Sequence, residues 1–167
     1  MPCKDVILPD PIVGRKGQTV QEILALLEEK HIRTVPILDD DNKLVGLFGY
    51  DQIMKGLLPV AVTMEDGLQT LDFLVGAAPG VAKRLRKLYP KLVEDVANTN
   101  CHVVYSSTST WEAVRLITKY GSPIPVIEEK TGDFIGVISE QSLIEDFKKI
   151  IQELEYEGAF EDKAEQA

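Results

Sequence analysis

The chain contains one pattern of residues twice, at an offset of about 90 positions. The opening Asp5 and Val6 match Asp95 and Val96. The copies then share a helix start, an apolar strand with a central proline and a strand with a glycine: residues 19–22 with 109–112, 34–38 with 124–127, and 44–48 with 134–138. A duplication of this length organises the chain into two similar units.

Each copy has the signals of a strand, a helix, two further strands and a closing helix. Thr19 and Ser109 each have a glutamate three residues later, which is the capping box that begins a helix. In the first copy, polar residues 39–42 separate two short apolar strands, which predicts a hairpin with a solvated turn. The closing helix is clearest in the second copy, where apolar residues recur at helical spacing over residues 143–154.

The residues between the copies predict a helical insert. Thr63 and Asp66 have capping spacing ahead of leucines at helical intervals. A second helix is expected to follow Pro79 and Gly80 and to end at Pro90, since proline cannot continue a helix. The expected organisation is a first repeat at 1–58, a helical insert at 59–93, a second repeat at 94–151 and an acidic C-terminal tail at 152–167.

Composition and charge exclude several classes of protein. With 167 residues and 44% hydrophobic residues, the chain can build a core without a metal or disulfide. Cys3 and Cys101 lack CxxC spacing and follow no recognisable secretory leader, so we expect free thiols in the cytoplasm. No apolar run approaches the ~18 residues of a membrane span. A net charge of −9 disfavours general binding to nucleic acid.

No recognisable set of residues supports catalysis or metal binding. His31 and His102 are the only histidines, and neither has a second ligand at suitable spacing. The acidic residues 39–42 lack the glycine and the closing glutamate of a calcium loop. No nucleophile has a histidine and an acid in a recognisable arrangement, and no phosphate-loop motif is present. We expect no enzyme activity, no catalytic residue and no metal ligand.

The duplicated pattern resembles the cystathionine-β-synthase (CBS) domain, and the tandem pair resembles a Bateman module. The similarity covers residues 4–58 and 94–150 and includes the proline strands and the glycines of the strands that follow. The resemblance implies an α/β fold of two β-α-β-β-α repeats with pseudo-twofold symmetry and a helical insert between them. It also implies clefts that bind AMP, ADP, ATP or S-adenosylmethionine, and a dimer formed through helices.

The family's nucleotide motif is a glycine, a hydroxyl residue three positions later and an acid or asparagine three positions after that. The second copy has Gly136, Ser139 and Ser142 at these places. Ser139 matches the residue that holds a phosphate, and Ser142 stands where an acid grips the ribose. A serine lacks the charged oxygens that make the stronger hydrogen bonds. The first copy departs further, with Gly49 for the hydroxyl and Gln52 for the acid.

Two interpretations of Ser139 are open, because a phosphate contact at a helix N-terminus and a plain helix cap use the same geometry. The resemblance implies that Ile124, Pro125 and Thr108 belong to the same ligand site. A hydroxyl-rich turn ahead of the next helix explains Thr108 equally well. The resemblance also implies a basic phosphate contact at Arg33 of the first copy; a surface arginine paired with an acid is the alternative.

A basic segment interrupts the otherwise acidic chain. Residues 73–93 contain no acid and five cations: Lys83, Arg84, Arg86, Lys87 and Lys91. Such a cluster binds a phosphate, a nucleic acid or an acidic partner, or it is a solvated face that pairs with the acidic tail. Trp111, directly after the second helix cap, is expected to be a packing anchor and not a platform for base stacking.

Together these features predict a regulatory module that senses an adenosyl ligand in the cleft between the repeats, with Ser139 as its main contact. The module is expected to form a homodimer and to signal to a separate protein, which the sequence does not identify. The alternative is a dimerising assembly module that has lost ligand binding, as the departures from the motif suggest.

Overall fold

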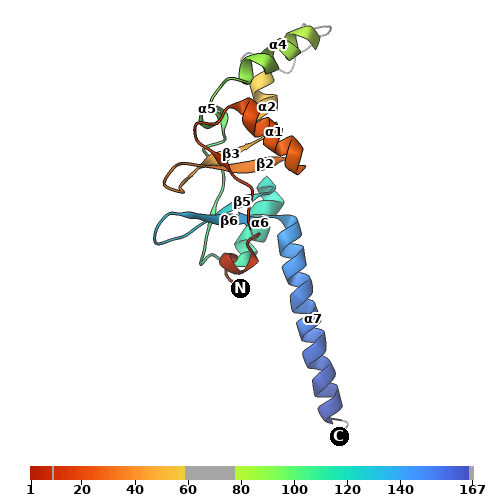
Figure 1. Cartoon of the computed structure of the whole chain (residues 1–167). Coiled ribbons are helices and arrows are strands. Elements are labelled where there is room, and N and C mark those ends of the chain that lie inside the picture. Colours follow the sequence, from red (N-terminus) through yellow and green to blue (C-terminus); the bar gives the residue numbers. More distant parts are fainter. Residues whose placement is uncertain (9, 59–77, 166–167) are drawn as a thin grey trace. The chain divides into compact units, whose positions relative to one another are not determined.

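The computed structural model describes residues 1–8, 10–58 and 78–165, without the side chains of residues 78–79 and 159–165. The chain forms two compact α/β units (Figure 1). The first-repeat unit comprises Ile12–Cys101, and the second-repeat unit comprises Met1–Pro11 together with His102–Ala167. Each unit has its own three-stranded sheet and its own apolar core. The first helix expected in the insert lies outside the described residues.

The first-repeat unit has the predicted order of elements, followed by two helices. They are β1 (Gly14–Arg15), α1 (Val20–Lys30), β2 (Thr34–Leu38), β3 (Leu44–Gly49), α2 (Tyr50–Leu57), α4 (Ala78–Leu88) and α5 (Val93–Val96). Strand β2 is central, parallel to β1 and antiparallel to β3. Helix α4 is the second helix expected in the insert, and it includes Pro79 and Gly80 instead of following them.

The second-repeat unit repeats this arrangement. Its elements are the 3₁₀ helix η1 (Cys3–Val6), β4 (Val104–Tyr105), α6 (Thr110–Tyr120), β5 (Ile124–Ile127), β6 (Phe134–Ile138) and α7 (Glu140–Glu165). Strand β5 is central, parallel to β4 and antiparallel to β6. The expected fold of two β-α-β-β-α repeats is confirmed, and the structure shows that each repeat has a mixed sheet.

Local hydrogen bonds explain where the elements begin and turn. At the start of α1, the backbone N–H of Glu22 donates to the Thr19 hydroxyl and the Glu22 carboxylate accepts from the Thr19 N–H, which completes the predicted capping box. In the β2–β3 turn, the Asp39 carboxylate accepts from the backbone N–H groups of Asp41 and Lys43, each at 2.9 Å. The acidic turn is therefore a hairpin turn, as expected.

The capping box predicted at Ser109 is only partly correct: the serine cap forms, but the Glu112 carboxylate has another partner. The Ser109 hydroxyl accepts from the Trp111 N–H at 3.3 Å, so the cap itself is present. Glu112 instead binds the guanidinium of Arg115, at 2.6 Å and 2.9 Å. An arginine one turn along the helix offers this carboxylate two charge-assisted bonds, which compete with the single backbone N–H.

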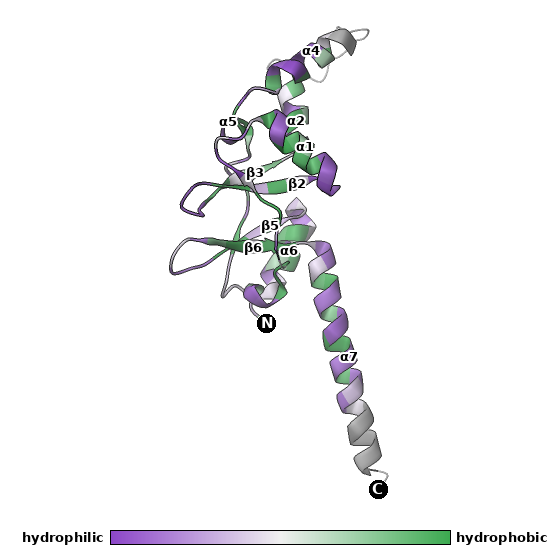
Figure 2. Cartoon of the chain, viewed as in Figure 1, coloured by the Kyte–Doolittle hydropathy of each residue, from purple (hydrophilic) through white to green (hydrophobic). Residues whose placement is uncertain are grey.

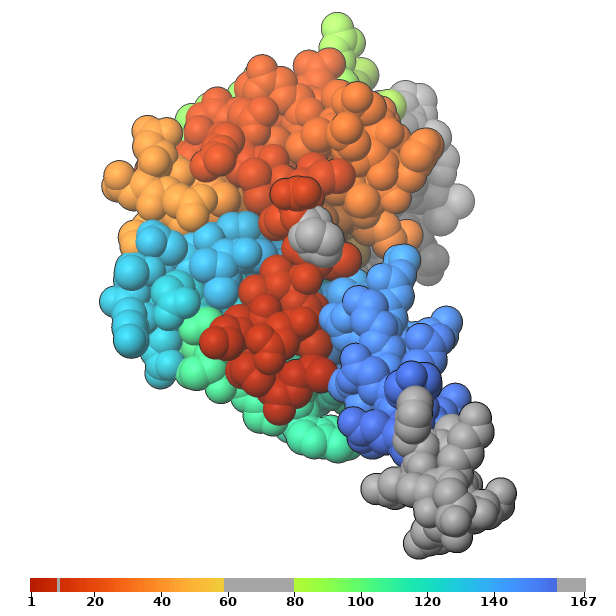
Figure 3. Space-filling view, turned by 60° about the horizontal axis from the view of Figure 1, so that its bottom comes forward, coloured from red at the N-terminus to blue at the C-terminus, as the bar shows by residue number. Residues whose placement is uncertain are grey.

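The opening segment of the first repeat, residues 1–8, belongs to the second-repeat unit. The backbone N–H of Cys3 donates to the carbonyl of Thr108 at 2.7 Å, and the N–H of Leu8 donates to the carbonyl of Val137 at 2.9 Å. In Figure 3 the red atoms of this segment lie between the green and blue surfaces of the same unit. The segment thereby extends the sheet and core of the other repeat.

The second repeat returns the same contacts through its own opening segment, residues 91–98. The N–H of Val93 donates to the carbonyl of Gln18 at 2.8 Å, and Asn98 exchanges two backbone hydrogen bonds with Leu47 of β3, at 2.8 and 3.0 Å. The two copies therefore exchange their opening segments. The boundaries of the packing units differ from those of the sequence repeats for this reason.

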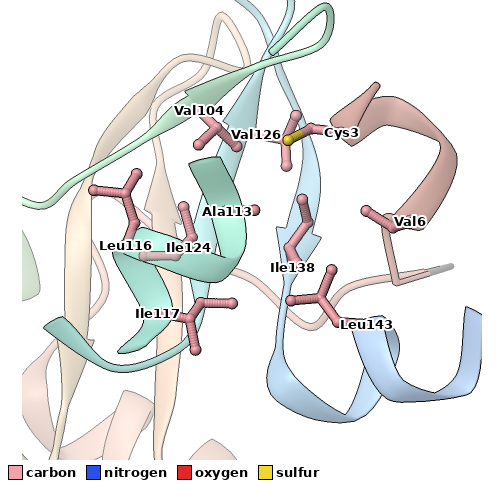
Figure 4. Packing of buried hydrophobic residues seen from close by; sticks show 10 residues of the cluster. All are labelled: Cys3, Val6, Val104, Ala113, Leu116, Ile117, Ile124, Val126, Ile138 and Leu143. Carbon is pink, nitrogen blue, oxygen red and sulfur yellow. The ribbon is translucent and has the colours of Figure 1, made fainter. Parts of the chain in front are cut away.

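Side chains of the exchanged segment fill the core of the second-repeat unit. Cys3 and Val6 are fully buried. Figure 4 shows them directed toward side chains of the sheet and of helices α6 and α7. The whole cluster comprises Cys3, Val6, Val104, Ala113, Leu116, Ile117, Ile124, Val126, Ile138 and Leu143.

Helix α7 has 26 residues and continues through the stretch that the sequence sets apart as an acidic tail. Glutamate, alanine and lysine are good helix formers, so the acidic composition does not stop the helix. Apolar and polar residues alternate along it (Figure 2). Ile144, Ile151 and Leu154 are more than half exposed. The side chain of Trp111, which was expected to be a packing anchor, is 81% exposed.

Among the described residues, no helix is both long and apolar enough to cross a lipid bilayer.

The exchange of opening segments predicts where a core mutation acts. Val6→Ala should lower the free energy of unfolding by about 1–3 kcal/mol, because it leaves a cavity in the core. Lys4→Ala, an exposed change in the same 3₁₀ turn, should cost less than about 0.5 kcal/mol. Hydrogen exchange should show the loss of protection of Val6→Ala in residues 104–147. Faster exchange confined to residues 12–58 would contradict the exchanged arrangement.

Candidate functional site

The predicted nucleotide motif of the second repeat forms the N-terminus of α7. The backbone N–H of Ser142 donates to the Ser139 hydroxyl at 3.2 Å, and the N–H of Ser139 donates to the Ser142 hydroxyl at 3.0 Å. The Ser142 hydroxyl in turn donates to the Ser139 carbonyl at 3.0 Å. The two serines therefore form a reciprocal helix cap, which was one of the two interpretations of Ser139.

The cap leaves the two hydroxyls with different chemistry. Ser142 is 4% exposed and its proton is used inside the cap. Ser139 is partly exposed and its oxygen accepts one bond, so its proton can be donated outward. A phosphate or another acceptor can therefore bind Ser139 without breaking the cap. The ribose contact predicted for Ser142 requires its hydroxyl to turn away from the Ser139 carbonyl.

A carboxylate lies at the same end of α7. Glu140 is the first residue of the helix, it is exposed, and its carboxylate accepts a hydrogen bond from the Ser122 hydroxyl. The partial positive charge of a helix N-terminus favours a carboxylate there. The same partial charge attracts a phosphate. An anionic ligand at Ser139 therefore meets one negative charge close by.

The structure brings some of the predicted site residues together and separates one. Ile124 lies opposite Ile138 in the β5–β6 pair, so the start of β5, with the buried Ile124 and Pro125, is next to Ser139. Thr108 follows β4, whose Tyr105 lies opposite the last residue of β5. Thr108 and Ser139 are therefore at opposite ends of β5.

The Thr108 hydroxyl accepts a hydrogen bond from the Tyr105 N–H at 3.0 Å. This bond supports the turn interpretation of Thr108.

The N-terminus of α2, the equivalent helix in the first repeat, is closed by the protein itself. The N–H of Gly49 donates to Oε1 of Gln52 at 2.8 Å, and the N–H of Tyr50 donates to the carbonyl of Arg33 at 3.2 Å. A Cβ at Gly49 would lie 2.2 Å from that carbonyl oxygen, which is far below van der Waals contact. The backbone of Arg33 therefore excludes the hydroxyl residue that the motif requires.

Arg33 itself is exposed, and it belongs to the first-repeat unit. Its backbone carbonyl, and not its guanidinium, makes the contact that shapes the α2 terminus. Sequence reasoning missed this role, because a backbone carbonyl has no side-chain signature. The glycine that replaces the motif hydroxyl was the one available signal.

The thiols and imidazoles lie in structural positions. Burial raises the pKa of the Cys3 and Cys101 thiols above the ordinary value of 9.0, so both remain protonated at neutral pH. His102 stacks on Tyr120 with the ring centres 3.7 Å apart. Within the described part of the chain, no three histidine, cysteine, aspartate or glutamate side chains are grouped to hold a metal.

The first-repeat unit contains an open cleft of about 420 Å³ between α2, α4 and the segment around α5. It is lined by Gln52, Lys55, Gly56, Leu88, Lys91, Asp95, Val96, Ala97 and Asn98. A smaller cavity of about 160 Å³ lies in the second-repeat unit beside Trp111, Phe147 and Ile150.

The family model described as CBS domain matches residues 3–59 and again residues 93–149. The chain belongs to the CBS domain family. The tandem pair inferred from the repeat is thus confirmed, and the two matched segments leave residues 60–92, with α4, outside the family model.

Two curated relatives illustrate the range of proteins that carry this pair. The chloroplastic CBS domain-containing protein CBSX1 of Arabidopsis thaliana is 31% identical over 136 residues, which is 79% of this chain and 57% of the relative. The A-adding tRNA nucleotidyltransferase of Aquifex aeolicus is 24% identical over 153 residues, which is 90% of this chain and 15% of the relative. The chain thus spans less than two thirds of either relative.

Solved structures agree with the fold. CBSX2 from Arabidopsis thaliana has a TM-score of 0.67 at 25% identity, with 90% of this chain and 96% of that chain covered. A structure of CBSX2 in complex with AMP has a TM-score of 0.63 at 25% identity, covering 89% of this chain and 97% of that chain. The CBS pair of MJ0100, in complex with 5′-methylthioadenosine and S-adenosyl-L-methionine, has a TM-score of 0.59. At 19% identity this last similarity shows the fold alone.

The two helix N-termini predict unequal losses of stability when their N-cap residues are exchanged. Gly49→Ser should cost about 1–3 kcal/mol of stability, because the new Cβ collides with the Arg33 carbonyl. Ser139→Gly should cost only a few tenths of a kcal/mol, about what glycine costs at a cap position. Denaturant unfolding of both variants measures the difference. A Gly49→Ser protein as stable as the unmodified one would show that the first repeat can accept the motif hydroxyl.

Proposed function

We propose that this chain is a regulatory CBS pair whose second repeat binds an adenosyl ligand at the N-terminus of α7. In this proposal the bound state is transmitted to a separate protein, and the chain itself performs no turnover. The observation that carries the proposal is the contrast between the two helix N-termini. At the start of α7, the Ser139 hydroxyl has a proton that it can donate to a ligand. At the start of α2, the Gln52 side chain and the Arg33 carbonyl already accept from backbone N–H groups.

The N-terminus of α7 has a hydrogen-bond donor that the protein itself does not use. A helix N-terminus leaves backbone N–H groups that attract an anion or a polar ligand atom. At α7 the reciprocal cap uses the N–H groups of Ser139 and Ser142 and leaves the Ser139 proton for a ligand. At α2 the carbonyl of Arg33 already accepts from the first N–H of the helix. The second repeat is therefore the better site.

Similarity to ligand-bound CBS pairs supports an adenosyl compound as the ligand class. CBSX2, which is 25% identical to this chain, has been solved in complex with AMP. Glu140 favours the members of this class with the least negative charge, since each added phosphate charge is repelled by the nearby carboxylate. We infer that AMP or a phosphate-free adenosyl compound binds better than ATP.

The similarity to enzymes is consistent with a regulatory role. The chain covers 15% of the tRNA nucleotidyltransferase and 29% of the inosine-5′-monophosphate dehydrogenase of Bacillus subtilis. In these proteins the shared part is a fraction of a much longer chain.

Calorimetric titration of AMP and adenosine into three variants tests the ligand site. Ser139→Ala removes one donor to a charged phosphate and should weaken AMP binding about tenfold. Glu140→Gln removes the nearby negative charge and should tighten AMP binding several-fold while leaving adenosine binding unchanged. Ser109→Ala is the matched control, because it removes an equivalent helix cap at α6, away from the site.

Equal AMP affinity in the Ser139→Ala and Ser109→Ala variants would contradict the site. Both variants lose about 1 kcal/mol of cap stability, so the comparison is made on protein shown to be folded.

A second candidate function is assembly through α7. Ile144, Ile151 and Leu154 form an exposed apolar stripe on α7. The exposed Trp111 of α6 lies beside Phe147 and Ile150 of α7. Solvent-exposed apolar side chains in such numbers on one helix favour a protein contact. We propose that two copies of the chain dimerise through this stripe, which serves either the regulatory or the assembly function.

Light scattering tests the dimer. The unmodified protein should have twice the chain mass of 18.5 kDa, and Leu154→Lys should shift the population toward monomer because it places a charge in the contact. Gln152→Lys is the control, since it adds the same charge at an exposed position beside the stripe. A mass of 18.5 kDa for the unmodified protein at every concentration would exclude the dimer.

A further inference from the structure

The helix between the two segments that match the CBS model, α4, is strongly cationic. Its four cations, Lys83, Arg84, Arg86 and Lys87, are all exposed. Figure 2 shows the hydrophilic character of this part of the helix. The chain has a net charge of −9, but residues 73–93 contain five cations and no acid. These cations create a local positive field.

Helix α4 also forms one wall of the 420 Å³ cleft in the first-repeat unit. Leu88 is buried and faces α2, where a Cβ at Gly56 would lie only 2.8 Å from Leu88 Cδ1. Since Gly56 has no side chain, α4 packs closely on α2 at this point. The contact between the two helices is therefore apolar, and the polar lining residues of the cleft surround it.

Two cations lie in the lining of the cleft. Lys55 of α2 and Lys91 both line the cleft, and the N–H of Lys91 donates to the Leu88 carbonyl at 3.0 Å. Lys91 therefore lies in the turn that directly follows α4. Two cations, Lys55 and Lys91, line a cleft whose lining contains one acid, Asp95.

We propose that this cleft is a second ligand site, distinct from the adenosyl site, for a compound that carries a chain of two or more phosphate groups. Its volume is within the range of small-molecule sites, about 300–1,000 Å³. The phosphate oxygens bind Lys55 and Lys91, and the amides of Gln52 and Asn98 offer neutral donors at the same rim. A nucleoside polyphosphate and an inorganic polyphosphate share this chemistry.

The probe for this site is inorganic tripolyphosphate, titrated calorimetrically at low and moderate salt. The double variant Lys55→Gln/Lys91→Gln should bind it at least about tenfold more weakly. The control Lys16→Gln/Lys30→Gln removes the same charge from exposed positions of the same unit outside the cleft and should retain its affinity. Asp95→Asn should tighten binding, because the repelling carboxylate is removed.

Several results would overturn the site. They are an absence of tripolyphosphate binding at low salt, an equal loss of affinity in the two double variants, or no gain with Asp95→Asn. Titration with ATP separates the two phosphate sources: tighter binding of ATP than of tripolyphosphate assigns a nucleotide, and the reverse assigns an inorganic chain. Ser139→Ala should leave tripolyphosphate affinity unchanged, so this proposal and the adenosyl proposal fail independently.

Discussion

Each unit of this protein is completed by a short segment of backbone from the other repeat, and the rest of the structure depends on that exchange. The N–H of Cys3 binds the carbonyl of Thr108 in one unit, and the N–H of Val93 binds the carbonyl of Gln18 in the other. Cys3 and Val93 are both fully buried. Neither repeat therefore has a complete core without the opening segment of its partner repeat. Duplication in this fold is a structural requirement of the unit.

The same symmetry makes the differences between the copies informative. Both closing helices follow a strand closely. In each, the backbone N–H of the residue before the helix donates to a side chain three positions later, which is Gln52 in α2 and Ser142 in α7. The strand backbone approaches α2 so closely at Gly49 that a side chain is excluded. At α7 the residue before the helix, Ser139, has the motif hydroxyl. The two copies thus share one architecture, but only Ser139 offers a ligand a proton.

Much of the fold followed from the sequence, because its signals are local. The capping box at Thr19 and the acidic hairpin turn at Asp39 formed as predicted, since both depend on bonds between residues a few positions apart. The family similarity then fixed the order of strands. The exchange of opening segments could not be predicted from the sequence, because its hydrogen bonds are made by backbone atoms. The Asp-Val pair that begins each copy was its one weak signal.

The candidate site was predicted less well, because its geometry depends on contacts between distant residues. The position of Thr108 at the far end of β5 follows from strand register, which residue spacing does not encode. The inward bond of Ser142 depends on burial. The exposure of Trp111 contradicts a general preference of tryptophan for the interior and shows that this part of α6 and α7 remains uncovered in one chain.

Hydrogen exchange of the unmodified protein with and without AMP compares the two helix N-termini in one experiment. AMP should slow exchange at the backbone amides of residues 140–143, at the start of α7. The amides of residues 50–53, at the start of α2, should exchange at the same rate in both samples. Protection of residues 50–53 without protection of residues 140–143 would assign the ligand to the first repeat and exclude Ser139 as its main contact.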